Sequence, residues 1–343
     1  MLFADLITSV PRMVMRVSNK MSERVRVAIL DDYQNVAFQF ADWSGIRDRL
    51  IIDSFPDTTA DEDVLAKRLE PYTIVCAMRE RTKFRASLLD RLPNLRLIAT
   101  TGMRNLGIDV AYAKTKGVTV VGTGGKGDST LEHIWAIILA TVRHIVVEDA
   151  RTKAGAVPWQ STIPMGLGGK TLGLLGVGRL GSETGRIAKA FGMEVIGWSP
   201  NLTPERAASA GVTFIPTKEE LFRRSDVLSV QIVLSERTHH IITAADLALL
   251  KPTAFFINTS RGPLVDEAAL IEVLKEKRIA GAGLDVFDEE PLPLDHPLRK
   301  LPNVTISPHM GYVSDDNYGQ AFWSQTVENI AAFLDGRPTR VMG

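Results

Sequence analysis

Three side chains suited to binding an acid and moving a proton each follow an apolar run in the second half of the chain. They are Arg261, Glu290 and His309. We predict that the three runs are β-strands, at residues 254–258, 281–286 and 304–307. In open α/β sheets, ligands bind beyond the C-terminal ends of the strands. The positions therefore predict that the three side chains meet at one edge of one sheet.

The three residue types suit a reaction on a carboxylic acid. The guanidinium of Arg261 can bind a carboxylate through two parallel hydrogen bonds, and it does not lose its charge. A carboxylate such as Glu290 beside the ring of His309 would stabilise the protonated imidazole and fix its tautomer, which makes a proton donor near neutral pH. Taken singly, each residue could instead be solvated on a loop. Their positions after three successive strands favour a shared site.

A glycine pattern within residues 172–181 is the strongest local signal. Gly176, Gly178 and Gly181 fit G-x-G-x-x-G after an apolar strand and at the start of a predicted helix. The first glycine permits a tight turn, the second lets the backbone approach a pyrophosphate, and the third lets helix and strand pack closely. The helix start adds free N–H groups and a positive dipole end. A glycine-rich turn without a ligand is the alternative, and the context favours a dinucleotide.

The end of the next strand bears on the type of dinucleotide. NAD-binding proteins usually carry an acid there, about 20 residues beyond the glycines, which bonds the ribose hydroxyls. Ser199 stands at that point in this chain. The carboxylate that would repel a 2′-phosphate is missing. Ser199 and Asn201 could bind such a phosphate, and Arg206 lies within a turn or two. The missing carboxylate favours NADP(H) over NAD(H). The preference is slight, because no arginine lies in the immediate turn.

The elements that must position these residues alternate between strand and helix from residue 25 onward. In the first part of the chain, predicted strands lie at residues 25–30, 50–52, 73–77, 95–99 and 118–121. Apolar residues at i, i+3, i+4 and i+7 predict one long helical segment over 129–154. A second alternating run starts at residue 171, and an amphipathic helix over 315–334 closes the chain. This order predicts an α/β protein with parallel sheets covered on both faces.

Length and composition limit the remaining possibilities. The 343 residues favour two domains. Lys+Arg and Asp+Glu both number 40, so charge gives no reason to expect nucleic acid or an anionic membrane as a partner. No run reaches the roughly 18 apolar residues of a membrane-spanning helix. We predict no metal ligands, and we expect residues 1–24 to be a disordered N-terminal extension.

The single cysteine, Cys76, excludes an intrachain disulfide and favours a cytoplasmic location. It lies in the apolar run 73–77. We therefore expect a buried strand residue, because a reactive thiol needs an exposed and electropositive setting.

Four segments together resemble the D-isomer-specific 2-hydroxyacid dehydrogenase family, which includes phosphoglycerate dehydrogenase and the glyoxylate/hydroxypyruvate reductases. The segments are residues 176–181, 258–263, 283–291 and 307–311, and the similarity extends from residue 25 to residue 337. The resemblance implies that Arg261 holds the carboxylate of a small 2-oxoacid and polarises its carbonyl. It implies that His309 protonates the carbonyl oxygen as hydride arrives and that Glu290 orients His309.

The resemblance also implies cofactor contacts. Asp285 and the backbone at Thr259 would hold the nicotinamide amide, and the backbone at Arg179 and Leu180 would meet the pyrophosphate.

The domain layout follows from the same resemblance. It implies a Rossmann nucleotide-binding domain, residues 123–308, inserted into a flavodoxin-like substrate domain, residues 25–122 and 309–343. The active site would lie in the cleft between the two domains. Members of the family are usually dimers, so we expect a homodimer.

The chain departs from the family pattern where the substrate would bind. The family has a Gly-x-Gly turn that offers N–H groups to the substrate carboxylate. Here only Gly102 is kept and Arg104 replaces the second glycine. Arg79 falls in the expected pocket loop, which is unusually charged. These changes leave the substrate open, and we name Gly102, Arg104 and Arg79 as candidate substrate-binding residues.

Three other classes of protein bear on this interpretation. A nicotinamide-binding sensor or corepressor with the same fold stays open, although the complete set of three reactive side chains argues against it. A formate dehydrogenase-like member would lack the glutamate beside the histidine, so Glu290 argues against that branch. L-lactate and malate dehydrogenases usually carry the glycine pattern near the N-terminus, whereas here it begins at Gly176.

Overall fold

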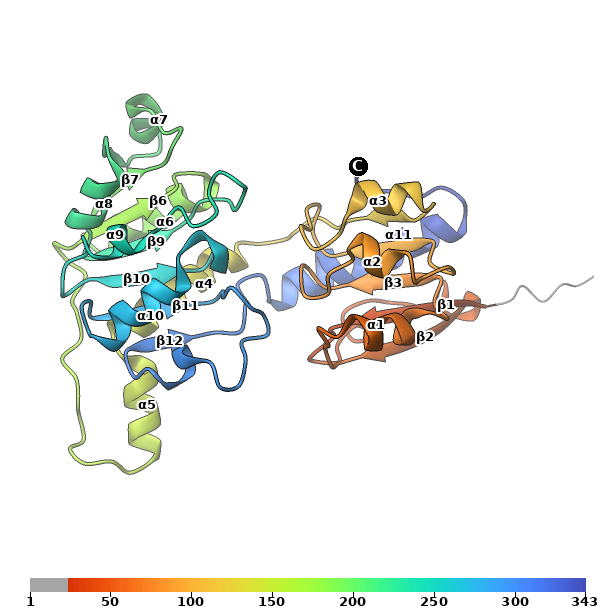
Figure 1. Ribbon diagram of the computed structural model, residues 1–343, viewed down its shortest axis with the longest axis horizontal. Helices are drawn as coiled ribbons and strands as arrows, with labels where there is room; N and C mark the ends of the chain where they lie inside the picture. The colour runs from red at the N-terminus through yellow and green to blue at the C-terminus, as the bar shows by residue number, and fades with distance from the viewer. Residues whose placement is uncertain (1–23) are drawn as a thin grey trace, which may run out of the picture.

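The computed structural model describes residues 24–343 and contains two β-sheets in separate lobes (Figure 1). All strand pairs in both sheets are parallel. The predicted extension over residues 1–24 lies outside the described residues except for its last position.

The first sheet has the strand order β2-β1-β3-β4-β5, which is the flavodoxin-like order. Its strands are β1 (Val25–Leu30), β2 (Leu50–Phe55), β3 (Ile74–Ala77), β4 (Leu97–Thr100) and β5 (Thr119–Val121). One face packs against α1 (Glu62–Leu69), α2 (Ala86–Leu89) and α3 (Val110–Thr115). The other face packs against the C-terminal helix α11 (Ser324–Leu334) and the π-helix η4 (Asn317–Trp323) before it. Because both faces are covered, the strands are continuous apolar runs in the sequence.

Cys76 lies in the middle of this sheet, on β3, and is buried as predicted. Burial alone raises the pKa of its thiol to about 12. The thiol is therefore protonated at neutral pH, which removes the thiolate that a reactive cysteine needs.

The second sheet has the strand order β12-β11-β10-β9-β6-β7-β8. Its strands are β6 (Thr171–Leu175), β7 (Glu194–Trp198), β8 (Thr213–Phe214), β9 (Val227–Val230), β10 (Phe255–Asn258), β11 (Gly281–Leu284) and β12 (Val304–Ile306). Read from β8 to β11, this is the order of a dinucleotide-binding Rossmann sheet, with β12 added at the edge. The order reverses between β6 and β9, and such a switch point leaves a crevice beyond the strand ends.

Helices cover both faces of the second sheet. One face packs against α4 (Ser129–Val142) and α6 (Arg179–Ala190). The opposite face packs against α8 (Lys218–Arg224), α9 (Ala244–Leu247) and α10 (Glu267–Lys275), while α7 (Pro204–Ser209) connects β7 to β8. These cores fix the strand ends, and therefore the loops that carry the candidate site.

The chain crosses between the lobes twice. It leaves the first sheet after β5, enters the second lobe through α4, and returns after β12 to place α11 on the first sheet (Figure 1). A Rossmann unit is thus inserted into a flavodoxin-like unit, which confirms the predicted fold class.

The prediction of one helix over residues 129–154 was wrong. His144 adopts a left-handed backbone conformation, with φ of 54°, and this ends α4 before α5 (Ile145–Lys153) begins. The two helices are bent by 63° at the break. Among the described residues, no single helix is long and apolar enough to cross a membrane, and this bent pair meets that test only by combined length and composition.

Candidate active site

The loop after β6 has the geometry that a dinucleotide needs. Gly176 has φ of +107°, and a Cβ there would lie 2.7 Å from the backbone of Gln231. A Cβ on Gly181 would lie 2.3 Å from the carbonyl oxygen of Gly176, so any side chain would push α6 away from the strand. Gly178 has open space around it. The loop therefore packs tightly against the protein at Gly176 and Gly181. It leaves free space at Gly178, where a pyrophosphate would approach.

A cavity of about 570 Å³ continues from this loop. Its lining includes Gly176, Gly178, Ser199, Asn201, Arg206 and Arg237. Arg206 is tied to the turn by a hydrogen bond of 2.9 Å from its Nη1 to the carbonyl oxygen of Asn201. Sequence reasoning missed Arg237, because it follows β9 and only the fold brings it beside Ser199. The space and its three cations, Arg104, Arg206 and Arg237, fit the ribose end of a dinucleotide.

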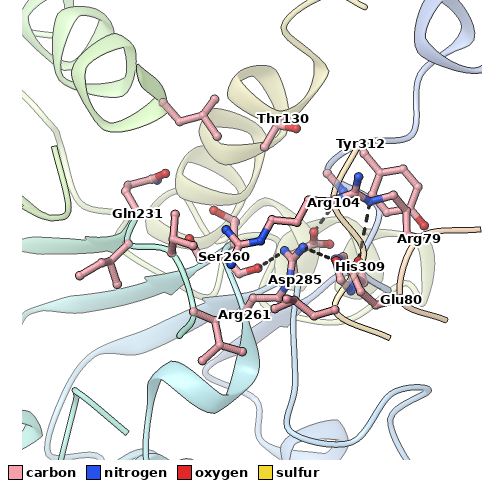
Figure 2. Close-up of a pocket in the computed structure, with 17 residues that line it drawn as sticks. Arg79, Glu80, Arg104, Thr130, Gln231, Ser260, Arg261, Asp285, His309 and Tyr312 are labelled. Atoms are coloured by element: carbon pink, nitrogen blue, oxygen red, sulfur yellow. Dashed lines mark hydrogen bonds and ion pairs between the residues drawn. The ribbon is translucent and has the colours of Figure 1, made fainter. Parts of the chain in front are cut away.

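A second cavity, of about 310 Å³, lies between the lobes (Figure 2). It brings together seven of the candidate residues from both halves of the chain, namely Arg79, Arg104, Leu180, Thr259, Arg261, Asp285 and His309. The three glycines of the loop after β6 and Ser199 lie outside it, and so do three further candidates. Gly102 packs behind Arg79, Arg179 pairs with Asp128 at the start of α6, and Glu290 lines a neighbouring cavity of about 320 Å³. His309 lines both cavities, so it stands between Glu290 and the space for a ligand.

His309 and Glu290 are in direct hydrogen-bond contact. The distance from His309 Nδ1 to Glu290 Oε2 is 2.6 Å. The other carboxylate oxygen of Glu290 accepts a hydrogen bond of 2.9 Å from the backbone N–H of Phe287. One ring nitrogen of His309 is thus occupied by a carboxylate that the backbone holds in place, which leaves Nε2 to exchange a proton with a ligand.

Arg261 is held at the end of β10 by its own loop and by the other lobe. Its Nη1 donates to the carbonyl oxygen of Ser260 at 2.7 Å, and its Nη2 donates to Glu80 Oε1 at 3.2 Å. Asn258 supports the loop by donating to the carbonyl oxygen of Arg261 at 3.0 Å. Burial works to raise the pKa of Glu80, but the charges of Arg261 and Arg79 outweigh it and hold that pKa below its usual value.

Asp285 is 1% exposed and its carboxylate is fully engaged by neighbouring groups. It accepts hydrogen bonds from the Ser307 hydroxyl at 2.5 Å and from the backbone N–H groups of Met310 at 3.0 Å and Gly311 at 3.1 Å. His133 Nε2 of α4 lies 3.0 Å away. Burial raises its pKa, and the hydrogen bonds from His133 and Ser307 more than offset this, so the pKa lies below its usual value. Asp285 therefore fixes the loop that carries His309.

These contacts add residues that the sequence did not single out. His133 and Ser307 hold Asp285, Glu80 pairs with Arg261, and Tyr312 stacks edge-on against His309 with ring centroids 5.9 Å apart. Among residues 24–343, no cluster of three or more His, Cys, Asp or Glu side chains could hold a metal ion.

Comparison with known proteins decides the family. The family model described as "D-isomer specific 2-hydroxyacid dehydrogenase, NAD binding domain" matches residues 135–311. A glyoxylate reductase from Aeropyrum pernix is 36% identical over 284 residues, which is 80% of this chain and 84% of that protein. The chain belongs to the D-isomer-specific 2-hydroxyacid dehydrogenases.

This dehydrogenase is also similar to a second curated protein and to a solved structure. A D-3-phosphoglycerate dehydrogenase from Methanocaldococcus jannaschii is 37% identical over 263 residues, or 76% of this chain and 50% of that protein. The crystal structure of a phosphoglycerate oxidoreductase from Vibrio cholerae matches with a TM-score of 0.85 and 36% identity, covering 91% of this chain and 99% of that one.

Family membership confirms the predicted reaction class. This protein is a nicotinamide-dependent dehydrogenase, an oxidoreductase acting on 2-hydroxyacids.

Proposed function

We propose that this dehydrogenase reduces a small 2-oxoacid to the D-2-hydroxyacid with NAD(P)H, using Arg261, Glu290 and His309 as its catalytic residues. The observation that carries the proposal is the contact of 2.6 Å between Glu290 and His309, beside the cavity that His309 shares with Arg261. An anion-binding group and a carboxylate-backed proton donor then face the same substrate.

The roles follow from the chemistry of each group. Arg261 binds the substrate carboxylate and polarises the adjacent carbonyl. When bound, the dihydronicotinamide supplies the hydride to the carbonyl carbon. His309 gives a proton from Nε2 to the carbonyl oxygen as negative charge develops there, and it takes the proton back in the reverse reaction. Glu290 keeps the ring oriented and stabilises its protonated form.

The proposed cofactor contacts run from one cavity to the other. Backbone N–H groups at Arg179 and Leu180, at the start of α6, would meet the pyrophosphate, as helix N-termini favour anions. Thr259 and Asp285 line the inter-lobe cavity and would hold the nicotinamide amide. Leu180 supports this placement of the cofactor, because it lies in the first turn of α6 and also lines the inter-lobe cavity.

We also propose a slight preference for NADP(H) over NAD(H). The cavity beside Ser199 has no acid among its lining residues and is bordered by Arg206 and Arg237. Two guanidiniums near the adenosine ribose would attract a 2′-phosphate, whereas a carboxylate there would repel it.

The domain boundaries of the proposal are residues 25–122 with 309–343 for the substrate domain and 123–308 for the nucleotide domain.

The assembly we propose is a cytoplasmic homodimer that acts on a small molecule, with no nucleic-acid or membrane partner. Support for a dimer comes from exposed apolar side chains in the segment after α5, where Val157 is 90%, Trp159 is 74% and Ile163 is 97% exposed. Such a concentration of exposed apolar surface marks an interaction site.

The test is a rate measurement with the purified protein. Oxidation of NADPH and NADH would be followed at the nicotinamide absorbance against glyoxylate, hydroxypyruvate and larger 2-oxoacids, and the chirality of the product would be determined. Turnover that gives the D-product supports the proposal, and the ratio of NADPH to NADH efficiency tests the cofactor preference. Tight dinucleotide binding without turnover on any 2-oxoacid would replace the proposal with the sensor or corepressor alternative.

A further inference from the structure

The loop after β11 carries Glu290, and a carboxylate from another element holds this loop. Glu267 Oε2 accepts a hydrogen bond of 3.2 Å from the backbone N–H of Asp288, two positions before Glu290. The other carboxylate oxygen, Oε1, lies 3.2 Å from Nε2 of His296, and both of these side chains are largely buried. Glu267 lines neither the inter-lobe cavity nor the cavity beside Glu290. Its contacts are therefore with the loop and not with a ligand in either cavity.

Glu267 is the first residue of α10, but that helix is capped by another side chain. The N-cap is Asp266, whose carboxylate accepts from the backbone N–H of Ala269 at 3.0 Å. Both contacts of Glu267, to Asp288 and to His296, lie outside the helix. Capping of α10 therefore does not account for the position of this carboxylate.

His296 is oriented to donate a hydrogen bond to Glu267. Its Nδ1 accepts from the backbone N–H of Leu298 at 3.4 Å, at the start of the 3-10 helix η3 (Pro297–Lys300). A ring nitrogen that accepts carries no hydrogen, so in the neutral ring the hydrogen is on Nε2, which faces Glu267. Burial, and next the charge of Glu267, raise the pKa of Asp288. The contact is thus kept even though it brings two acids close together.

Glu267 also ties the loop to the part of the chain that carries Arg261. After Arg261 the chain runs through a short 3-10 helix, η2 (Gly262–Leu264), into α10. A Cβ on the first residue of η2 would lie 2.0 Å from the carbonyl carbon of Phe287. The bond between Glu267 and Asp288 is a second connection between the same two segments. It reaches the loop one residue closer to Glu290.

We propose that Glu267 is a positioning residue, which holds the loop so that Glu290 stays in contact with His309. His296 keeps the carboxylate of Glu267 in place. The inference rests on the proposed function, in which the Glu290–His309 pair transfers the proton. Without its bond to Glu267, the backbone at Asp288 would be free to shift and would carry Glu290 with it. Such a shift is costly, because a misplacement of about 1 Å can reduce a rate about 100-fold.

Glu267→Gln is the central variant, because it keeps the shape of the side chain. An amide has one oxygen where the carboxylate has two, so one of the two donors, at Asp288 or at His296, loses its acceptor. The variant should lower kcat for 2-oxoacid reduction by about tenfold, as a partial misplacement would, while KM for the dinucleotide stays at the parent value. Glu272→Gln is the matched control. It removes an exposed carboxylate of the same helix that pairs with Lys275, and kcat should not change.

A double-mutant cycle separates positioning from a general effect on the fold. If Glu267 acts through Glu290, Glu267→Gln should change kcat by less than about twofold in a protein that already carries Glu290→Gln. A general loosening of the fold would lower kcat by the same factor in both backgrounds. Thermal melting of each variant checks that it is folded.

His296→Phe keeps a ring and removes the donor to Glu267. It should lower kcat in the same direction, and this effect should also disappear in the Glu290→Gln background. The second variant keeps the test valid if Glu267→Gln fails to fold.

The outcomes separate this inference from the proposed function. A Glu267→Gln enzyme with the parent kcat, or an equal loss of kcat in both backgrounds, would overturn the positioning role while the 2-oxoacid reductase stands. Absence of turnover by the parent protein on every 2-oxoacid, or a Glu290→Gln enzyme with the parent kcat, would remove the proposed role of Glu290 and this inference with it.

Discussion

His309 has one ring nitrogen bound to a carboxylate and the other available to the cavity. Glu290 occupies Nδ1 at 2.6 Å, and the backbone of Phe287 holds Glu290 in turn. An unsupported histidine on a loop would sample several rotamers and both tautomers. The carboxylate selects one orientation, so the ring is arranged for proton transfer before a ligand arrives.

Replacing His309 with alanine should lower kcat for 2-oxoacid reduction by about 100-fold or more, which is the range for general acid–base catalysis. Steady-state rates at saturating dinucleotide check this. His239→Ala removes an exposed histidine that does not line the inter-lobe cavity, and it should leave kcat unaltered. A His309→Ala enzyme with the parent kcat would show that another group delivers the proton.

Glu290→Gln should lower kcat for reduction. The neutral amide no longer stabilises positive charge on the ring of His309 and holds the ring less firmly in one orientation. Steady-state rates at saturating dinucleotide measure the loss. Glu289→Gln, at the neighbouring exposed carboxylate, serves as the control. A Glu290→Gln enzyme with the parent kcat would break the proposed pairing.

At the scale of elements, the site depends on how closely two loops approach each other. Gly262 follows Arg261 after β10, and the chain passes against Phe287 and Asp288, which lie after β11. A Cβ on Gly262 would lie 2.0 Å from the carbonyl carbon of Phe287. Arg261 and Glu290 are therefore positioned by one shared backbone contact, in addition to their own hydrogen bonds.

Gly262→Ala should both destabilise the protein and reduce its activity. The extra methyl group must push the two loops apart, at a cost of about 1–3 kcal/mol for overpacking, and this displaces Arg261 from the Glu290–His309 pair. Thermal unfolding and kcat/KM would be measured together. Gly45→Ala is a matched control, because nothing lies within 4 Å of a Cβ there. Equal effects of the two substitutions would contradict the close approach.

At the scale of the whole molecule, the segment around α5 stands out from the second lobe. Figure 1 shows α5 and the loop after it extending away from the rest of that lobe. The loop carries Val157, Trp159 and Ile163, all with most of their surface exposed. Burying such side chains against a second copy would remove apolar surface from water, which favours association.

Trp159→Glu should weaken the proposed dimer, because it puts a charge into an apolar interface. Light scattering coupled to size-exclusion chromatography at several protein concentrations would show a smaller mass for the variant. Leu294→Glu alters a side chain that is 90% exposed in another loop, and its mass should equal that of the parent. A parent protein that is monomeric at all concentrations would overturn the homodimer.

The sequence alone determined the features that arise from local patterns. Apolar runs alternating with helical stretches gave the two parallel sheets, since a strand buried on both faces must be apolar along its length. Gly176, Gly178 and Gly181 were recognisable because a tight turn and a close helix leave no room for a Cβ. Arg261, Glu290 and His309 were selected because strand ends meet at one edge. The break at His144 was not predicted, because a left-handed residue other than glycine leaves no mark in apolar periodicity.

Contacts between groups far apart in the sequence depend on the tertiary structure. Glu80 pairs with Arg261 across 181 positions and His133 bonds Ser307 across 174, and no local pattern encodes contacts between residues so far apart. Arg237 joins Ser199 in one cavity only because β9 and β7 both end at the same edge of the sheet. Arg79 was named as a candidate from the sequence, but the direction of its side chain was not. Its left-handed backbone and the space beside Gly102 turn it toward the cavity, because side-chain direction depends on packing that only the folded chain supplies.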